Sequence, residues 1–127
     1  MLATIAAYVF SILAVVVAVF QIALVAGMPW GKLTWGGKHP GRLPPSMRVA
    51  AFASALLMGV FAVVVVSRAG LAFSSLQPAS SVGIWIVVAY CVLGVIANSV
   101  TRSPWERVLW LPSTLLMLAG CVIVAVS

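Results

Sequence analysis

Two side chains in this sequence could carry acid–base chemistry near neutral pH, namely His39 and Glu106, because the chain contains one histidine and one acidic residue. Nucleophilic catalysis requires a base beside the nucleophile and a third group that orients the base. Metal catalysis and paired-carboxylate chemistry require several ligands or acids together. One residue of each kind cannot provide these arrangements. We therefore expect a protein that is not an enzyme and that carries no cofactor and no catalytic metal ion.

Glu106 lies in a segment that predicts the start of a helix. The residues from Ser103 to Glu106 match the capping-box pattern S-x-x-E, and Pro104 occupies the first helical position, where its missing N–H costs nothing. We expect the Glu106 carboxylate to bind the backbone N–H of Ser103 and to pair with Arg102 or Arg107 at the positive end of the helix. The alternative is a role in handling a substrate or a proton.

Two amide side chains interrupt the apolar segments of the chain. Gln21 and Asn98 fall near one end of their segments, at a depth close to that of Arg102 and Glu106. An amide inside a membrane usually bonds to another helix, so we expect Gln21 and Asn98 to bridge helices. If the bundle contains a ligand pocket, we expect it in this vestibule.

The segment 27–46 is rich in glycine, proline and tryptophan. Glycine permits positive φ and proline fixes φ, so this segment is predicted to follow one specific path rather than form a helix or sheet. Trp30 and Trp35 each precede a glycine, and we expect their rings to pack against the mouth of the bundle, so that the loop caps the helix ends. A ligand lid and a docking surface for a partner protein are the alternatives. His39 is expected to be solvated, because a metal or haem ligand would need partners that the chain does not offer.

Composition places these residues in a membrane protein. Of the 127 residues, 65% are hydrophobic and 6% are charged, with a mean hydropathy of +1.27, whereas about 25% of the residues in an ordinary soluble domain are charged. We predict an all-α single domain over residues 1–127, an integral membrane antiparallel four-transmembrane-helix bundle with a structured loop over 27–46. A spanning helix needs about 20 mostly apolar residues, and the segments that qualify are 2–26, 47–67, 82–100 and 106–126.

Basic residues set the predicted orientation. Six of the seven lie in the first and third connections, counting the helix flanks, and Arg68 is alone on the opposite side. Short basic loops resist translocation, so we predict that both connections face the cytoplasm and that both termini lie outside. The net charge of +6 then indicates contact with anionic lipid headgroups. It does not indicate nucleic-acid binding, because the chain has no run of Lys and Arg that could follow a groove.

Four short motifs stand out in the loops and at the start of the last apolar segment: Gly27–Gly31 (GMPWG), Trp35–Gly37 (WGG), Leu43–Pro44, and Ser103–Arg107 (SPWER) followed by Pro112. These motifs are similar to those of a group of small bacterial four-helix membrane proteins with no assigned activity. The resemblance covers nearly the whole chain. It implies a four-helix architecture and a multi-pass location in the bacterial cytoplasmic (plasma) membrane, and it implies no activity and no binding residue.

From these features we expect a non-enzymatic accessory or binding subunit that contacts membrane lipid or a partner membrane protein through its basic cytoplasmic face. The alternative is a small homo-oligomeric channel or transporter for a neutral or anionic solute. The candidate ligand or partner site comprises Gln21, Trp30, Trp35, His39, Asn98, Arg102 and Glu106.

Overall fold

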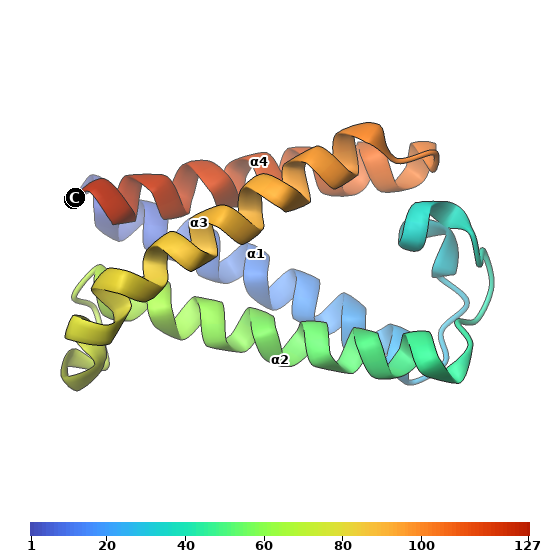
Figure 1. The fold of residues 1–127 in the computed structure, drawn as a ribbon, viewed down its shortest axis with the longest axis horizontal. Helices are drawn as coiled ribbons and strands as arrows, with labels where there is room; N and C mark the ends of the chain where they lie inside the picture. Colours follow the sequence, from blue (N-terminus) through green and yellow to red (C-terminus); the bar gives the residue numbers. More distant parts are fainter.

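The computed structural model describes all residues from 1 to 127, and it is all-helical, with no β-strand. Four long helices account for most of the chain (Figure 1). Each of the four is long and apolar enough to cross a membrane. The helices are α1 (Leu2–Val25), α2 (Pro45–Arg68), α3 (Gln77–Val100) and α4 (Pro104–Val126), and the short 3₁₀ turns are η1 (Gly31–Leu33), η2 (Trp35–Gly37) and η3 (Ser74–Leu76).

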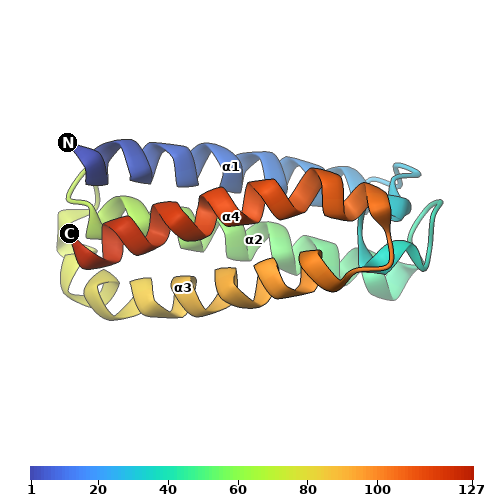
Figure 2. The same cartoon turned by 90° about the horizontal axis from the view of Figure 1, so that it is seen from above.

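The four helices pack side by side as a bundle in which α1 contacts α2 and α4, and α3 completes the ring between them. Both termini and the turn between α2 and α3 lie at one end of the bundle, the terminal end (Figure 2). The loop between α1 and α2 and the connection between α3 and α4 lie at the opposite end, the loop end. Helix α2 packs more extensively on α1 than on α3, and α2 and α3 diverge toward the loop end (Figure 1).

The helix boundaries are close to the predicted segments except at the start of α3. Hydropathy predicts a span from Val82, but the helix begins at Gln77. Its first turn is polar, so a hydropathy window misses it, although Pro78 is favoured in a first helical turn. The hydroxyls of Ser80 and Ser81 each donate to the Gln77 carbonyl at 2.9 Å. These hydrogen bonds stabilise the first turn of α3, so that it does not depend on the packing of large apolar side chains.

The core divides into two clusters along the bundle. The larger cluster joins fully buried residues such as Phe10 and Ile84 from all four helices. The smaller cluster, at the loop end, joins Phe20, Trp110 and Leu43. Leu43 belongs to the loop between α1 and α2, and it is buried. The loop is therefore anchored in the core rather than lying on the surface.

The outward faces of the helices are also apolar. Helices that are hydrophobic on all sides are typical of an apolar environment. Together with the length and composition of the helices, these faces indicate a membrane protein. Examples that are more than half exposed, one from each helix, are Ile12, Val60, Leu93 and Leu116.

Candidate functional site

Helix α4 begins with the side-chain cap that the sequence predicts. The hydroxyl of Ser103 accepts a hydrogen bond from the backbone N–H of Glu106 at 3.2 Å, and Pro104 is the first helical residue. The second half of the predicted capping box is wrong. The N–H of Ser103 donates to the Thr101 hydroxyl at 3.3 Å, so this donor is satisfied without the Glu106 carboxylate.

The Glu106 carboxylate bonds to the loop instead. Its Oε2 accepts a hydrogen bond from the N–H of Gly36 at 3.0 Å. The predicted ion pair with Arg102 or Arg107 is not formed either. Arg107 donates to the Thr101 carbonyl at the end of α3, and the Arg102 side chain is exposed. The carboxylate is therefore bonded to a backbone group and has no cationic partner in the chain.

Three hydrogen bonds from the first turns of α4 hold the segment Lys32–Gly36 in place, and we call this set the loop clamp. One is the bond from Gly36 to Glu106. In the second, the Ser103 hydroxyl donates to the Lys32 carbonyl at 2.7 Å. In the third, the indole N–H of Trp110 donates to the Leu33 carbonyl at 2.8 Å. The clamp satisfies backbone groups that the irregular loop cannot satisfy by itself.

The backbone conformation of the loop requires glycine at two positions, Gly31 and Gly36. A Cβ on Gly31 would overlap the carbonyl oxygen of His39 and would lie 2.5 Å from that of Gly41. The Gly31 N–H donates to this same Gly41 carbonyl at 3.0 Å, so only glycine fits there. Gly36 has a φ of +64°, which glycine adopts without steric cost. Trp35 has a φ of +53°, which is uncommon for a bulky residue, and its side chain is 49% exposed.

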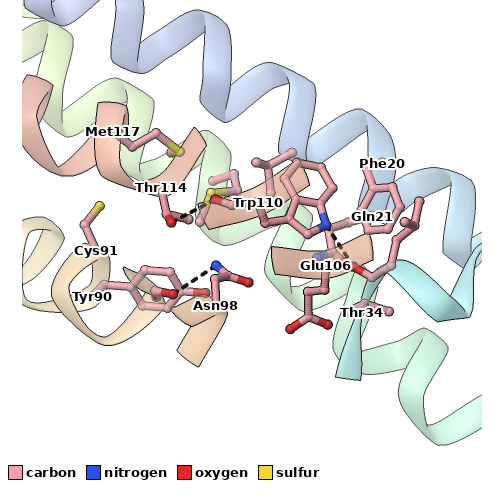
Figure 3. Close-up of a pocket in the computed structure, with 14 residues that line it drawn as sticks. Phe20, Gln21, Thr34, Tyr90, Cys91, Asn98, Glu106, Trp110, Thr114 and Met117 are labelled. Carbon is pink, nitrogen blue, oxygen red and sulfur yellow. Dashed lines mark hydrogen bonds between the residues drawn. The ribbon is translucent and has the colours of Figure 1, made fainter. Parts of the chain in front are cut away.

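A cavity of about 170 Å³ lies beneath the loop clamp, among α1, α3 and α4 (Figure 3). Its walls are mostly apolar, aromatic and sulfur-containing. Apolar walls with a few convergent polar groups are the usual lining of a small-molecule site, and this cavity is smaller than the pockets of about 300–1,000 Å³ that hold drug-sized ligands. The lining residues are Val17, Phe20 and Gln21 from α1, Met58 from α2, Tyr90, Cys91, Gly94 and Asn98 from α3, Glu106, Trp110, Thr114 and Met117 from α4, and Leu33 and Thr34 from the loop.

Polar groups gather at the end of the cavity next to the loop. Asn98 does not bridge helices as predicted. Its Nδ2 donates to the Gly94 carbonyl of its own helix at 2.9 Å, and its Oδ1 has no protein partner. Gln21 does not bridge helices either, because its side chain forms no hydrogen bond with the protein. Gln21 and Thr34 also line this end of the cavity. Glu106 is 8% exposed, and its Oε1 has no hydrogen-bond donor. The cavity therefore presents free oxygen acceptors, one of them charged, and no basic side chain lines it.

The structure divides the predicted site residues between the cavity and the surface. Gln21, Asn98 and Glu106 come from three helices and line the cavity together (Figure 3). Trp30 stacks on Phe20, with ring centroids 6.3 Å apart, so it covers a residue of the cavity wall from outside. The remaining predicted residues are not cavity residues and lie at the loop-end surface: Trp35, His39 and Arg102.

Trp110 is the main cavity residue that the sequence analysis missed. It belongs to the loop clamp, and its ring centroid lies 4.8 Å from that of Phe20. A signal was present, because Trp110 follows Glu106 by one helical turn and shares its helix face. Thr34 also lines the cavity, but its position depends on the path of the loop, for which the sequence offers no periodic pattern.

The surface of the loop end is basic and aromatic. The Lys32 Nζ lies 5.2 Å from the ring centroid of Trp105, which is 60% exposed. Arg48 is not part of this surface chemistry, because its guanidinium donates to the Val25 carbonyl at 2.6 Å and caps the end of α1. The exposed basic residues at this end are Lys32, Lys38, Arg42, Arg102 and Arg107.

No protein-family model, curated protein or solved structure matches this chain. The site is therefore interpreted from its own chemistry. No group of three or more His, Cys, Asp or Glu side chains is arranged to hold a metal ion. Cys91 and Cys121 are buried free thiols, and Cys91 contributes to the cavity wall. The cavity can hold a ligand by charge, by hydrogen bonding and by aromatic contact.

Proposed function

We propose that the chain spans the bacterial cytoplasmic membrane four times as an antiparallel bundle, with the loop end in the cytoplasm and both termini outside. The support is the charge distribution: six of the seven basic residues flank the loop end, and Arg68 alone flanks the terminal end. Reporter fusions after Ser127 test this orientation. An alkaline phosphatase fusion should be active and a green fluorescent protein fusion dark, and the reverse result would overturn the orientation.

We infer that the protein is a non-enzymatic membrane subunit that binds anionic lipid headgroups through its loop end. The observation that carries this proposal is the separation of charge. The exposed cations and indoles share one end of the bundle, whereas the only carboxylate, Glu106, is buried beneath them. Each basic residue near an anionic surface contributes about 1 kcal/mol, and indole rings anchor at the headgroup level. The loop clamp holds these groups in one arrangement.

Native mass spectrometry of the protein in mixed phosphatidylglycerol and phosphatidylcholine nanodiscs tests this function. Phosphatidylglycerol should be retained preferentially, and Arg102→Gln should reduce its retention. Arg68→Gln is the matched control, because it removes a cation from the terminal end, and it should retain as much as the unmodified chain. Equal retention of the two lipids would refute the proposed binding of anionic headgroups. If the two lipids are retained equally and another protein co-purifies, the binding partner of the loop end is a membrane protein and not a lipid.

A second function, a small homo-oligomeric channel or transporter, is favoured by the cavity itself. The carboxylate in its wall fits a neutral solute better than an anion, because a buried negative charge repels anions. A pore would lose solute flux into proteoliposomes on Gln21→Ala or Asn98→Ala, and native mass spectrometry would show a closed homo-oligomer. A lipid-binding subunit would tolerate both changes.

A further inference from the structure

The cavity beneath the loop clamp has a charge opposite to that of the molecule as a whole. The chain carries a net charge of +6, yet its one acidic side chain lines the cavity and no basic side chain does. Glu106 is 8% exposed, and its Oε1 has no donor. Oε1 is accessible to a bound molecule, and the low-dielectric surroundings of the largely buried side chain strengthen its electrostatic interactions. A cation that enters the cavity therefore gains more electrostatic energy than it would beside an exposed carboxylate.

The remaining walls determine which kind of cation fits. The rings of Phe20, Tyr90 and Trp110 line the same cavity, and organic cations bind over aromatic faces. Inorganic ions such as Mg²⁺ and Ca²⁺ need about six or more oxygen ligands in a close shell. The side-chain oxygens of Glu106 and Asn98 without a protein donor lie toward the loop, and the Thr114 hydroxyl is already bonded to its own helix. Most of the wall is carbon and sulfur. A cation with a charged end and an apolar body matches this division.

We propose that the cavity binds a small organic ammonium ion, with the Glu106 carboxylate as its counter-ion. The ammonium donates to Glu106 Oε1 and to Asn98 Oδ1, and the alkyl part lies among the aromatic rings. A volume of about 170 Å³ is similar to that of an engineered cavity that binds benzene, so it accommodates a ligand of about six non-hydrogen atoms. This site is distinct from the lipid-binding surface proposed above, which uses the outer face of the loop end. A soluble amine and the headgroup of an aminophospholipid both present the required chemistry.

Saturation-transfer difference NMR on the full chain in deuterated detergent tests the site without any substitution. Butylammonium, 1-butanol and butyrate are similar in size and differ in charge. Butylammonium should bind saturably and about tenfold more tightly than 1-butanol, a difference of about 1.4 kcal/mol, and butyrate should not bind. Equal affinities for butylammonium and 1-butanol would overturn the proposal. Displacement of butylammonium by an equal concentration of magnesium chloride would identify an inorganic site and would also overturn it.

Three variants then place the site in the cavity. Glu106→Gln removes the charge but keeps an oxygen that can accept the hydrogen bond from Gly36. Butylammonium should therefore bind about tenfold more weakly, a loss of about 1.4 kcal/mol. The affinity for 1-butanol should not change. Gly94→Leu fills the cavity and should abolish binding of both; a Cβ there would lie 3.8 Å from Thr114 Cγ2, an ordinary contact. Gly59→Leu is the matched control, because a Cβ there meets nothing within 4 Å. Unchanged butylammonium binding in Glu106→Gln or Gly94→Leu refutes the proposal.

Nanodiscs distinguish the two sources of the ammonium group. Phosphatidylglycerol nanodiscs contain no amine, and nanodiscs with added phosphatidylethanolamine contain a competing headgroup. A weaker apparent affinity for butylammonium in the second lipid assigns the site to the aminophospholipid. An equal affinity in both lipids assigns it to a soluble amine. Either result supports the ammonium site. Binding of butylammonium to the Gly94→Leu variant in nanodiscs would contradict it.

Discussion

The Glu106 carboxylate accepts a hydrogen bond of 3.0 Å from the N–H of Gly36, a residue 70 positions earlier in the chain. The bond uses Oε2, Oε1 accepts no hydrogen bond from the protein, and Glu106 lines the cavity beneath the loop. One side chain therefore holds the loop in place and supplies the charge of the cavity wall. A ligand that displaces the carboxylate must also displace the loop, so the occupancy of the cavity and the position of the loop are linked through Glu106.

Glu106→Ala should release the loop. The substitution leaves the part-buried N–H of Gly36 without a protein acceptor. Full burial of an unsatisfied donor costs about 1 to 3 kcal/mol, so we expect a loss at the lower end of that range, about 1 kcal/mol. Glu106→Gln keeps an acceptor oxygen and removes the buried charge, so it should lower the free energy of unfolding by less. Thermal unfolding in detergent, with hydrogen exchange of residues 31–37, measures both effects. Equal losses in the two variants would show that the charge, and not the hydrogen bond, holds the loop.

Trp110→Phe should loosen the same loop from its other side. The variant keeps an aromatic ring against Phe20 but removes the indole N–H that bonds to the Leu33 carbonyl. We expect a loss of stability of about 1 kcal/mol and faster amide exchange in the loop segment. Trp85→Phe is the control, because the Trp85 ring is exposed, lies in α3 and donates no hydrogen bond to the protein. Unchanged exchange in Trp110→Phe would contradict the loop clamp.

Much of the architecture could be predicted from hydropathy, because four long apolar segments leave few alternatives to four helices. The cap at Ser103 was also predictable, since S-x-x-E is a local pattern in which the partners are three positions apart. The start of α3 was not, because its first turn is stabilised by serine hydroxyls that bond to Gln77 and hydropathy does not register such bonds.

The site residues were predictable only where their place in the site follows from how far along a helix they lie. Gln21, Asn98 and Glu106 meet in one cavity because each lies near the loop end of its helix. The partner of Glu106 was not predictable, since it is a backbone group of Gly36 whose position depends on the three positive φ values in η2, at Trp35, Gly36 and Gly37. The capping-box pattern assigned the carboxylate to the nearest free N–H, and the loop brought another donor within reach.

Gly31→Ala should disrupt the loop. Its Cβ would overlap the His39 carbonyl, which is backbone and cannot rotate away, so we expect a loss of about 1 to 3 kcal/mol. Gly41→Ala offers a matched control in the same loop, because a Cβ there meets nothing within 4 Å, and it should change stability by less than about 0.5 kcal/mol. Limited proteolysis of the loop reads out the difference. Similar cleavage rates in the two variants would contradict the close approach at Gly31.

Gly120→Ala should push α1 and α4 apart by a few tenths of an ångström. A Cβ at Gly120 would lie 3.1 Å from the Ala6 carbonyl oxygen and 3.5 Å from Phe10 Cβ, so the α1 backbone has to move, at a cost of about 1 to 3 kcal/mol. Gly59→Ala is the matched helical control, because its Cβ enters open space and it should gain up to about 1 kcal/mol from helix propensity. Thermal unfolding in detergent should therefore shift in opposite directions for the two variants. A stabilising effect of Gly120→Ala equal to that of Gly59→Ala would show that α1 and α4 do not meet at this glycine.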